Sequence, residues 1–293
     1  MNSTNDAKSP LITLFAIPKA FDGSSSIIQE NAIHSWLSLG PDVKVQLFGD
    51  DPGVAEFAER HTIEYFANIS KNEFGTPLLD SVFQQASDAA TTPLLAYVNC
   101  DIILFRDFVD AVERVQKKLV GENFLAIGRR TNLSVDQRFD FLNPKTSSKV
   151  QTQAREKGTP ETVACKDYFV FPKAMCDQIP GFAVGRGIWD NWMVHDAKCK
   201  SIPVVSLTPS VLAVHQENES SLQGQRRYRN YVSGPEARLN QQLAGGRHLV
   251  RGSTSTHRLN GDELQACRWH WLGYEFWFDF HRFARLLANF VGK

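Results

Sequence analysis

Asn99 and Asp101 interrupt an otherwise apolar stretch, residues 94–104 (LLAYVNCDIIL). They are two residues apart, so in an extended chain both side chains point to the same face. A carboxylate there suits a hard divalent cation, which in turn can neutralise a diphosphate. An ordinary turn explains the same residues without a metal, because Asn and Asp are common turn formers. Taken alone, the N-x-D triplet favours the turn.

Asp50 and Asp51 follow a second apolar stretch, in residues 47–53 (LFGDDPG). A carboxylate at this point can accept a hydrogen bond from the N–H of a uracil or guanine base, and an Asp-rich turn is the alternative. In an open α/β sheet, ligands bind beyond the carboxyl ends of the strands. Two strands that both end in acidic residues therefore favour a ligand site at that edge.

Three further segments carry side chains that suit a phosphate, a sugar or a metal ion. Thr76 and Pro77, in NEFGTPLL, lie at the start of an expected helix, and the N–H groups at a helix N-terminus favour phosphate. A plain N-cap at Thr76, with Pro77 in the first turn, is the alternative explanation of the same residues. His215 ends the apolar stretch VLAVH, and imidazole suits Mn²⁺; a packed or surface histidine is the alternative. Arg129 and Arg130 close FLAIGRR and can bind a sugar or phosphate by forked hydrogen bonds, while solvated arginines are the commoner outcome.

Asp190 stands between Trp189 and Trp192 in GRGIWDNWMVHD. Sugar rings present apolar faces that stack on aromatic side chains, and an adjacent carboxylate can bind their hydroxyl groups. Alternatively, the tryptophans pack in the core and Asp190 caps their helix. Asp167, at the start of DYFVF, is a second acid expected to face the same region.

Strands and helices alternate over the first hundred residues. We expect strands at residues 11–17, 43–48, 63–66 and 94–98, and helices at residues 27–39, 54–60 and 76–90. This alternation predicts a parallel sheet covered by helices. In the second half we expect helices at residues 106–119 and 147–157, and a segment at residues 185–199 that starts with glycines and becomes helical. We expect strands at residues 123–128, 166–173, 202–207 and 211–215, and loops at residues 129–145 and 216–252.

The two ends of the chain differ from this middle part. Residues 1–9 are polar and expected to be disordered. Residues 10–260 are expected to form one domain, and residues 261–293 a helical, strongly aromatic segment. Its apolar face suits packing on the domain or contact with a membrane surface, and packing is the favoured interpretation.

Composition limits the partners. The 293 residues include 32 basic and 32 acidic side chains, so we expect no nucleic acid or anionic membrane held by bulk charge. Five cysteines without a CxxC pair favour reduced thiols. The N-terminus does not resemble a secretory signal, and no apolar run reaches the roughly 18 residues of a membrane span, so we expect a soluble cytoplasmic protein.

The order of strand, helix, LFGDD and an apolar strand that runs into a D-x-D-like triplet resembles the nucleotide-sugar glycosyltransferases of the GT-A fold. The resemblance covers roughly residues 11–257, and NEFGTPLL, YVNCDIIL, DYFVF and WDNW are similar to segments of nucleotide-diphospho-sugar transferase sequences. It implies an α/β fold with a mixed, mainly parallel, Rossmann-like sheet flanked by helices, and a C-terminal helical segment. The chain departs from the family at Asn99, where the family has the first Asp of its triplet.

The resemblance implies a hexosyl- or pentosyltransferase that uses a UDP- or GDP-linked sugar with Mn²⁺ or Mg²⁺. Asp101 would hold the metal ion, His215 would complete its shell, and Asn99 would contact the ribose or support the ligands. Asp50 or Asp51 would select the base. Thr76, before its helix, would contact the nucleotide.

The second half of the chain would serve the acceptor. By the resemblance, residues 10–130 hold the nucleotide sugar and residues 131–260 the acceptor, a hydroxyl group of a glycan, a glycolipid or a small molecule. Asp190 would be the general base if the reaction inverts, with Asp167 as a second catalytic acid; a retaining enzyme would not need Asp190 in that role. A membrane would be touched at most peripherally, through the C-terminal aromatic helix.

Two other functions remain open from the sequence. A sugar-phosphate nucleotidyltransferase has a related sheet, but its glycine-rich basic loop is missing after Ile17, where PKAFDG stands. An inactive binding module with the same fold is hinted at only by Asn99.

Overall fold

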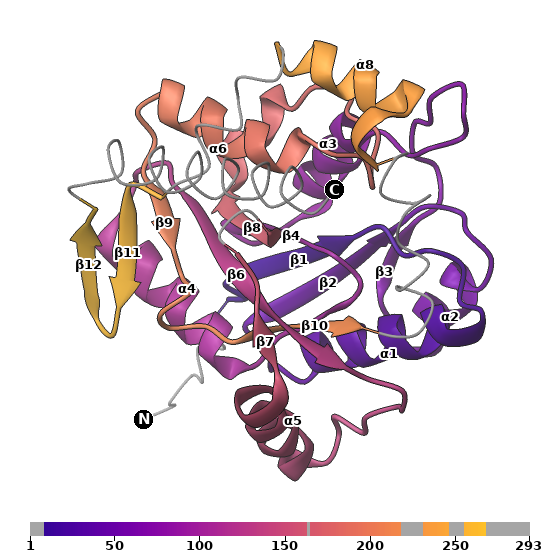
Figure 1. The fold of residues 1–293 in the computed structure, drawn as a ribbon, viewed down its shortest axis with the longest axis vertical. Helices are drawn as coiled ribbons and strands as arrows, with labels where there is room; N and C mark the ends of the chain where they lie inside the picture. Colours follow the sequence, from indigo (N-terminus) through magenta and orange to yellow (C-terminus); the bar gives the residue numbers. More distant parts are fainter. Residues whose placement is uncertain (1–8, 163–164, 218–230, 246–254, 268–293) are drawn as a thin grey trace, which may run out of the picture.

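The computed structural model describes residues 9–162, 165–217, 231–245 and 255–267 (Figure 1). Its strands are β1 (Ile12–Ala16), β2 (Val43–Phe48), β3 (Glu64–Phe66), β4 (Leu94–Val98), β5 (Ile102–Ile103), β6 (Leu125–Ser134), β7 (Thr159–Pro160), β8 (Lys166–Pro172), β9 (Val204–Ser206), β10 (Ala213–Glu217), β11 (His257–Asn260) and β12 (Glu263–Ala266). Its helices are α1 (Gly23–Leu37), α2 (Val54–Arg60), α3 (Leu79–Ala89), α4 (Arg106–Lys118), α5 (Pro144–Lys157), the 3₁₀ helix η1 (Lys173–Gln178), α6 (Trp189–Cys199) and α8 (Pro235–Leu243).

The N-terminal half of the sheet is parallel, in the order β3-β2-β1-β4. Leu14 in β1 pairs with Val45 on one side and Ala96 on the other. The two central strands, β1 and β4, are buried on both faces, which is why these two segments read as continuous apolar runs. The predicted alternation of strands and helices is confirmed here, and β2 and α2 have the predicted bounds.

Helices cover both faces of this sheet (Figure 1). Leu14 belongs to the core cluster shared with α1, α2 and α4, while its neighbour Phe15 belongs to the cluster shared with α3 and α6. Successive side chains of a strand point to opposite faces, so one strand serves both layers. The fold is thus a helix–sheet–helix sandwich with an apolar core on each face of this sheet.

The C-terminal half of the sheet is mixed. β8 lies antiparallel between β4 and β6, and β9 and β11 then extend the sheet parallel to β6. β6 is longer than expected: residues 129–134, predicted as loop, are strand because β10 and β7 pair with them. Gly128 lies at the register shift between Ile127 and Arg129, where an added Cβ would stand 1.7 Å from the Tyr168 hydroxyl oxygen.

Three predictions about helices are wrong. α3 begins at Leu79 instead of residue 76, because Pro77 and the next residue, Leu78, pair in isolated β-bridges. Residues 235–243, predicted as loop, form α8, which opens on Pro235 in its first turn. Residues 263–266, predicted to be part of the C-terminal helical segment, form β12 instead, since the turn at Gly261 (φ +56°) folds them back onto β11.

The remainder of the predicted C-terminal helix, residues 268–293, lies outside the described residues, as do residues 1–8, predicted to be disordered. Among the described helices, none is both long enough and apolar enough to cross a membrane.

The topology brings several chain segments to one edge of the sheet. β1, β2 and β4 are parallel and end there, and β6 runs in the same direction because both it and β4 are antiparallel to β8. β8 therefore begins at this edge, with Lys166 and Asp167. Asn99, directly after β4, meets Asp167 at the start of β8 and, through it, Arg130 in the middle of β6.

Candidate active site

Asp101 and His215 are brought together by β10, which lies between β5 and the second half of β6. His215 is in register with Ile102, the residue after Asp101, and on its other side with Asn132. The Nε2 atom of His215 is 3.5 Å from Oδ2 of Asp101. The backbone N–H of Gln216 also donates to the carbonyl oxygen of Asp101, at 3.1 Å. The predicted metal pair is therefore adjacent in space.

Buried polar side chains fix this arrangement on α1. The indole Nε1–H of Trp36 donates to the carbonyl of Ile102 at 2.9 Å. The side chain of Gln216 donates to the carbonyl of Ile28 at 2.9 Å and accepts from Asn31 at 3.0 Å. Buried polar groups need such partners, and here they hold β5 and β10 in place on either side of the Asp101–His215 pair.

The electrostatics of the pair favour the charged forms. Burial opposes ionisation of Asp101, but the hydrogen bond and charge of His215, with Lys19 and Arg130, outweigh it and lower the pKa of the carboxyl. Burial likewise opposes protonation of His215, and the carboxylate of Asp101 outweighs it and raises the pKa of the imidazole. Oδ1 of Asp101 is buried and has no hydrogen-bond partner among the described residues.

These residues fit a divalent cation. Nδ1 of His215 lies 3.1 Å from Oδ1 of Asn132, so an Nδ1–H can donate to that oxygen; when a metal ion displaces the Nε2 proton, the Nε2 lone pair faces Asp101. Metal-binding histidines are oriented in this way by a partner on their other nitrogen. An unpartnered carboxylate oxygen and an imidazole nitrogen suit Mn²⁺ or Mg²⁺. Among the described residues, no three His, Cys, Asp or Glu side chains are grouped to hold a metal ion, so further ligands would come from substrate and water.

Asn99, Asp167 and Arg130 form a second cluster beside this pair. Nδ2 of Asn99 donates to Oδ1 of Asp167 at 2.9 Å, and the Asn99 backbone N–H donates to the Asp167 carbonyl at 3.0 Å. Nη1 of Arg130 lies 3.1 Å from each carboxylate oxygen of Asp167. Burial raises the pKa of Asp167 despite the charge of Arg130. Because its oxygens are occupied by Arg130 and Asn99, Asp167 is better suited to anchor these side chains than to take up a proton.

Asp190 lies in the first turn of α6, a helix that begins directly after the strained residue Ile188. Ile188 has φ +94°, a value that β-branched residues rarely adopt and that often marks functional sites. Oδ1 of Asp190 is buried and has no hydrogen-bond partner among the described residues. Burial raises the pKa of this carboxyl, against the charge of Lys166 and backbone N–H groups. Asp190 thus combines an unpartnered carboxylate oxygen with a raised pKa, whereas the pKa of Asp101 is lowered.

Lys166 is a buried cation at the start of β8, only 5% exposed. Its Nζ donates to Oδ1 of Asn191 at 3.2 Å, and burial lowers its pKa while Asp190 opposes that shift. Burial raises the pKa of the Tyr231 phenol, and the negative charges of Asp190 and Asp167 raise it further. The carbonyl of Tyr231 accepts from the N–H of Gly187 at 2.9 Å, next to the strained turn.

The two tryptophans of WDNW have different surroundings. Trp189 is 7% exposed and packs edge-on against Tyr97 at 5.2 Å and against Phe169 at 5.1 Å, so it is a core residue. Trp192 is partly exposed and lies against Phe182, with ring centroids 5.4 Å apart. Stacking on a sugar is therefore available to Trp192 and not to Trp189.

Three other predicted site residues have different partners. Asp50, beyond β2, forms an ion pair with Lys71, which lowers the pKa of its carboxyl. Asp51 is exposed, and its carbonyl accepts from the N–H of Val54 at the start of α2. Thr76 lies near Glu236 and helps to lower the pKa of that carboxyl. No contact described for these three joins them to the Asp101 cluster, and the helix that was to place Thr76 at a phosphate begins three residues later.

Sequence reasoning missed Lys166, Asn132 and Tyr231, and favoured a solvated Arg130. Asn132 falls in a segment predicted as loop, so its pairing with His215 was not visible. Lys166 could have been found from the sequence. It directly precedes Asp167 and the apolar run YFVF, and this pattern places both charged residues at the start of a strand. Tyr231 lies in a weakly patterned region that gave none.

Comparisons with known proteins show the fold. No model of a known protein family and no curated protein matches the chain. The chain is similar to the structure of S. aureus TarS 1–349 in complex with UDP-GlcNAc, with a TM-score of 0.50 and 11% identity, over 80% of this chain and 65% of that chain. The predicted GT-A-like fold is confirmed: a mixed sheet flanked by helices.

Two weaker similarities were also found. Mannosyltransferase PcManGT from Pyrobaculum calidifontis, in complex with GDP-Man and Mn²⁺, has a TM-score of 0.46 and 13% identity, over 77% of this chain and 63% of that chain. Glucosyl-3-phosphoglycerate synthase from Mycobacterium tuberculosis, in complex with Mn²⁺, UDP and glucosyl-3-phosphoglycerate, has a TM-score of 0.45 and 12% identity, over 81% of each chain.

Proposed function

We propose that this protein is a glycosyltransferase that moves a sugar from a nucleoside diphosphate to an acceptor hydroxyl group, with the aid of a divalent cation. The observation that carries the proposal is the Asp101–His215 pair at the carboxyl edge of the sheet, with an unpartnered carboxylate oxygen and an imidazole oriented by Asn132. This edge is where open α/β sheets bind ligands.

The donor in this proposal is a UDP- or GDP-linked sugar. Asp101 and His215 would hold Mn²⁺ or Mg²⁺, and the ion would neutralise the diphosphate as it leaves. Asn99, whose amide nitrogen is bound to Asp167, keeps its carbonyl oxygen for a ribose hydroxyl. Asp50 or Asp51 would accept from the base.

The acceptor in this proposal is a hydroxyl group of a glycan, a glycolipid or a small molecule, bound on the side of α6. Asp190 takes the hydroxyl proton while the acceptor oxygen bonds to the anomeric carbon, and the bond from that carbon to the diphosphate oxygen breaks. The raised pKa of Asp190 brings it closer to that needed of a general base. Attack from the face opposite the leaving group inverts the anomeric configuration.

Thermal-shift screening tests the central claim. UDP, GDP and their common sugar conjugates are added with and without Mn²⁺ to the wild-type protein and to Asp101→Ala. We expect one nucleotide to raise the melting temperature only with Mn²⁺ and only in the wild type. If no nucleoside diphosphate raises the melting temperature, the proposal is wrong.

Product analysis separates the proposal from its alternatives. A glycosyltransferase releases UDP or GDP from the sugar donor, slowly to water and faster with an acceptor. A nucleotidyltransferase would require a nucleoside triphosphate and a sugar phosphate and would release pyrophosphate. A binding module would show the thermal shift without turnover, and either of these results would reject the proposal.

A further inference from the structure

Two histidines face each other across the helices that cover one face of the sheet. His34 lies in the last turn of α1, and His61 directly follows α2. Both helices pack on the same core cluster. The Nε2 atoms of the two imidazoles are 3.4 Å apart, and both side chains are partly exposed, so a solute can reach the space between them.

Phe57, in α2, holds both imidazoles in place. Its side chain is buried, and its ring centroid lies 4.4 Å from that of His61 and 5.7 Å from that of His34. Phe57 is itself stacked on Phe21, with ring centroids 4.6 Å apart. The two imidazole planes are inclined at 67° to each other. The mutual orientation of the histidines is therefore set by packing before any ligand binds, which lowers the cost of binding one.

The distance between the two nitrogens is long for a hydrogen bond and suits a shared metal ion. N–H donors in proteins usually lie about 2.7–3.2 Å from their acceptors. Zinc binds imidazole nitrogens at about 2.0–2.1 Å, so an ion shared by two nitrogens 3.4 Å apart makes an N–Zn–N angle of about 112°. This is close to the tetrahedral angle of roughly 109° that zinc sites adopt. The right angle of an octahedral ion with bonds of the same length would require about 2.9 Å.

The charges around the pair also suit a cation. In the metal-free chain, burial lowers the pKa of both imidazoles, with further lowering of His34 by His61 and of His61 by Arg60. Neutral imidazoles offer the lone pairs that a metal ion requires. The negative charge of Glu30 acts on both histidines, and that of Asp140 acts on His34. Two carboxylates thus supply negative charge beside the two ring nitrogens.

Water would complete the coordination of such an ion. The carboxylate of Glu30 is engaged elsewhere, since it accepts from the hydroxyl of Ser26 and from Nε of Arg138, both at 2.6 Å. In the part of the chain that the structure describes, no third His, Cys, Asp or Glu joins the pair in a group that holds a metal ion. Two protein ligands and two water molecules then give a four-coordinate zinc ion.

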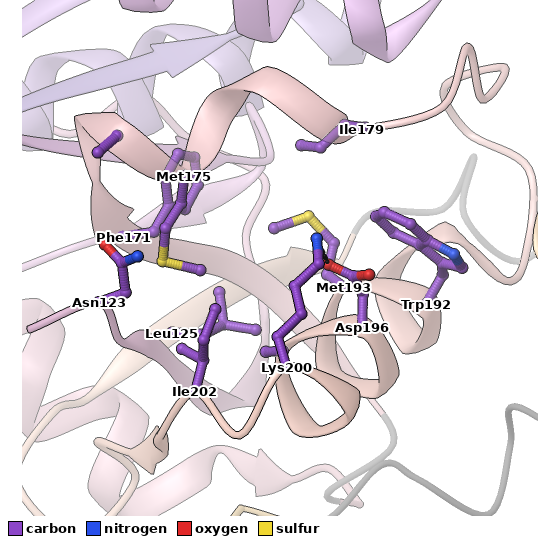
Figure 2. Close-up of a pocket in the computed structure, with 12 residues that line it drawn as sticks. Asn123, Leu125, Phe171, Met175, Ile179, Trp192, Met193, Asp196, Lys200 and Ile202 are labelled. Carbon is purple, nitrogen blue, oxygen red and sulfur yellow. Dashed lines mark hydrogen bonds and ion pairs between the residues drawn. The ribbon is translucent and has the colours of Figure 1, made fainter.

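The cavity between η1 and α6 offers no comparable pair. Figure 2 shows Met175 and Met193 pointing into it. Of the described residues that line it, only Asp196 and Lys200 carry a charge, and Nζ of Lys200 donates to Oδ2 of Asp196 at 2.7 Å. The charges in the cavity therefore neutralise each other, whereas the two histidines direct two ring nitrogens at one point.

We propose that His34 and His61 form a zinc site that links the last turn of α1 to the end of α2. The ion bonds to Nε2 of both imidazoles, and water takes the other positions. Trp36, two residues after His34, holds β5 beside Asp101. A zinc ion that fixes α1 against α2 therefore stiffens a helix on which the candidate active site rests. The zinc site does not depend on the proposed transfer reaction.

Zinc titration needs a background in which other sites are removed. His195 lies 3.4 Å from Sγ of Cys199, and His215 lies 3.5 Å from Oδ2 of Asp101, so each of these pairs is able to bind zinc by itself. The background is therefore His195→Gln/His215→Ala in the full-length chain. Bound Zn²⁺ is measured by competition with a chromophoric chelator.

Replacement of each histidine in this background tests the two ligands. We expect His34→Gln and His61→Gln each to remove one equivalent of bound Zn²⁺. The matched control is His257→Gln, a partly exposed histidine whose Nδ1 contacts the hydroxyl of Thr256; it should leave the bound zinc unchanged. If either His34→Gln or His61→Gln leaves the stoichiometry unchanged, that residue is not a ligand and the proposal is overturned.

Unfolding in urea gives a second measurement in the same background. Excess Zn²⁺ should raise the urea midpoint, because the two histidines lie together only in the folded chain. His61→Gln, at a partly exposed helix end, should keep the fold and abolish this increase. Long-range ¹H–¹⁵N NMR spectra of the background should show Zn²⁺ shifting Nε2 of both histidines. An equal increase of the midpoint in His61→Gln, or a shift of one nitrogen only, refutes the shared ion, and a pair that is merely hydrogen-bonded would show neither response.

Discussion

The contact between His215 Nδ1 and Asn132 Oδ1 predicts how replacement of Asn132 will change metal binding. Asn132→Leu removes the acceptor while it keeps a side chain of similar size in β6. The imidazole then loses the partner that fixes both its orientation and its tautomer, so Nε2 is no longer held toward Asp101.

The expected loss of metal affinity in Asn132→Leu follows from the role of Asn132 as the partner that orients a metal-binding histidine. Partners of this kind change metal affinity by roughly 10- to 100-fold when they are removed. At about 1.4 kcal/mol for each factor of ten, the loss is about 1.4–2.7 kcal/mol of binding free energy. The free energy of unfolding without metal should fall by only about 0.5–1.5 kcal/mol, the usual net value of one hydrogen bond.

The assay is calorimetric titration of Mn²⁺ in the presence of a saturating nucleoside diphosphate, with urea unfolding of the metal-free protein alongside. Asn132→Asp is the matched control, because it keeps the acceptor and adds a negative charge, which favours a metal-bound imidazole. We expect Asn132→Asp to bind Mn²⁺ at least as tightly as the wild type. If Asn132→Leu binds Mn²⁺ with unchanged affinity, His215 is not a ligand oriented by Asn132.

Three further predictions concern charged groups. Asp190→Asn should lower the transfer rate roughly 10²- to 10⁴-fold, the usual contribution of a general base, while the thermal shift with the donor is unchanged; loss of donor binding would show that Asp190 has another role. Arg130→Met leaves the buried carboxylate of Asp167 unpaired and should lower the free energy of unfolding by about 3–5 kcal/mol in urea titration, a loss that Arg130→Met/Asp167→Leu should largely reverse. The Nε2 atoms of His34 and His61 lie 3.4 Å apart. Burial lowers the pKa of both imidazoles; the charge of His61 lowers that of His34 further, and the charge of Arg60 lowers that of His61 further. The unfolded chain therefore binds more protons just below pH 6.5, so the urea midpoint should fall as the pH drops through this range, and it should fall less in His34→Gln; an identical pH dependence in both proteins would contradict this account.

The sequence was informative where structure depends on local patterns. β4 ends at Val98, as predicted, because Asn99 and Asp101 cannot continue a strand that is buried on both faces. The parallel direction of β1, β2 and β4 followed from the helices between them. The pairing of Asp101 with His215, more than 100 residues apart, came only from the family resemblance, since periodicity within a strand does not specify its neighbour.

The errors concern long-range pairing. Arg129 to Asn132 read as loop because they are polar, yet β10 and β7 supply their backbone partners. The hairpin of β11 and β12 was missed for the same reason: β9 provides the edge on which it forms. α8 lacks an apolar stripe, and its inward side chains are the polar Glu236 and Asn240. Asn240 exchanges two hydrogen bonds with the backbone of Ala183, a role that no pattern in the sequence reveals.

The extended β6 has a mechanical consequence for the site. Arg130, which holds Asp167, and Asn132, which contacts His215, are separated by a single residue on one strand. The cluster of Asn99, Asp167 and Arg130 and the proposed metal pair are therefore set at a fixed spacing by covalent geometry, and no domain closure is needed to assemble them. Binding energy from a donor is then not consumed in joining these two parts. Any closing motion around a substrate must come instead from elements that β6 does not carry, such as the strained turn at Ile188 before α6.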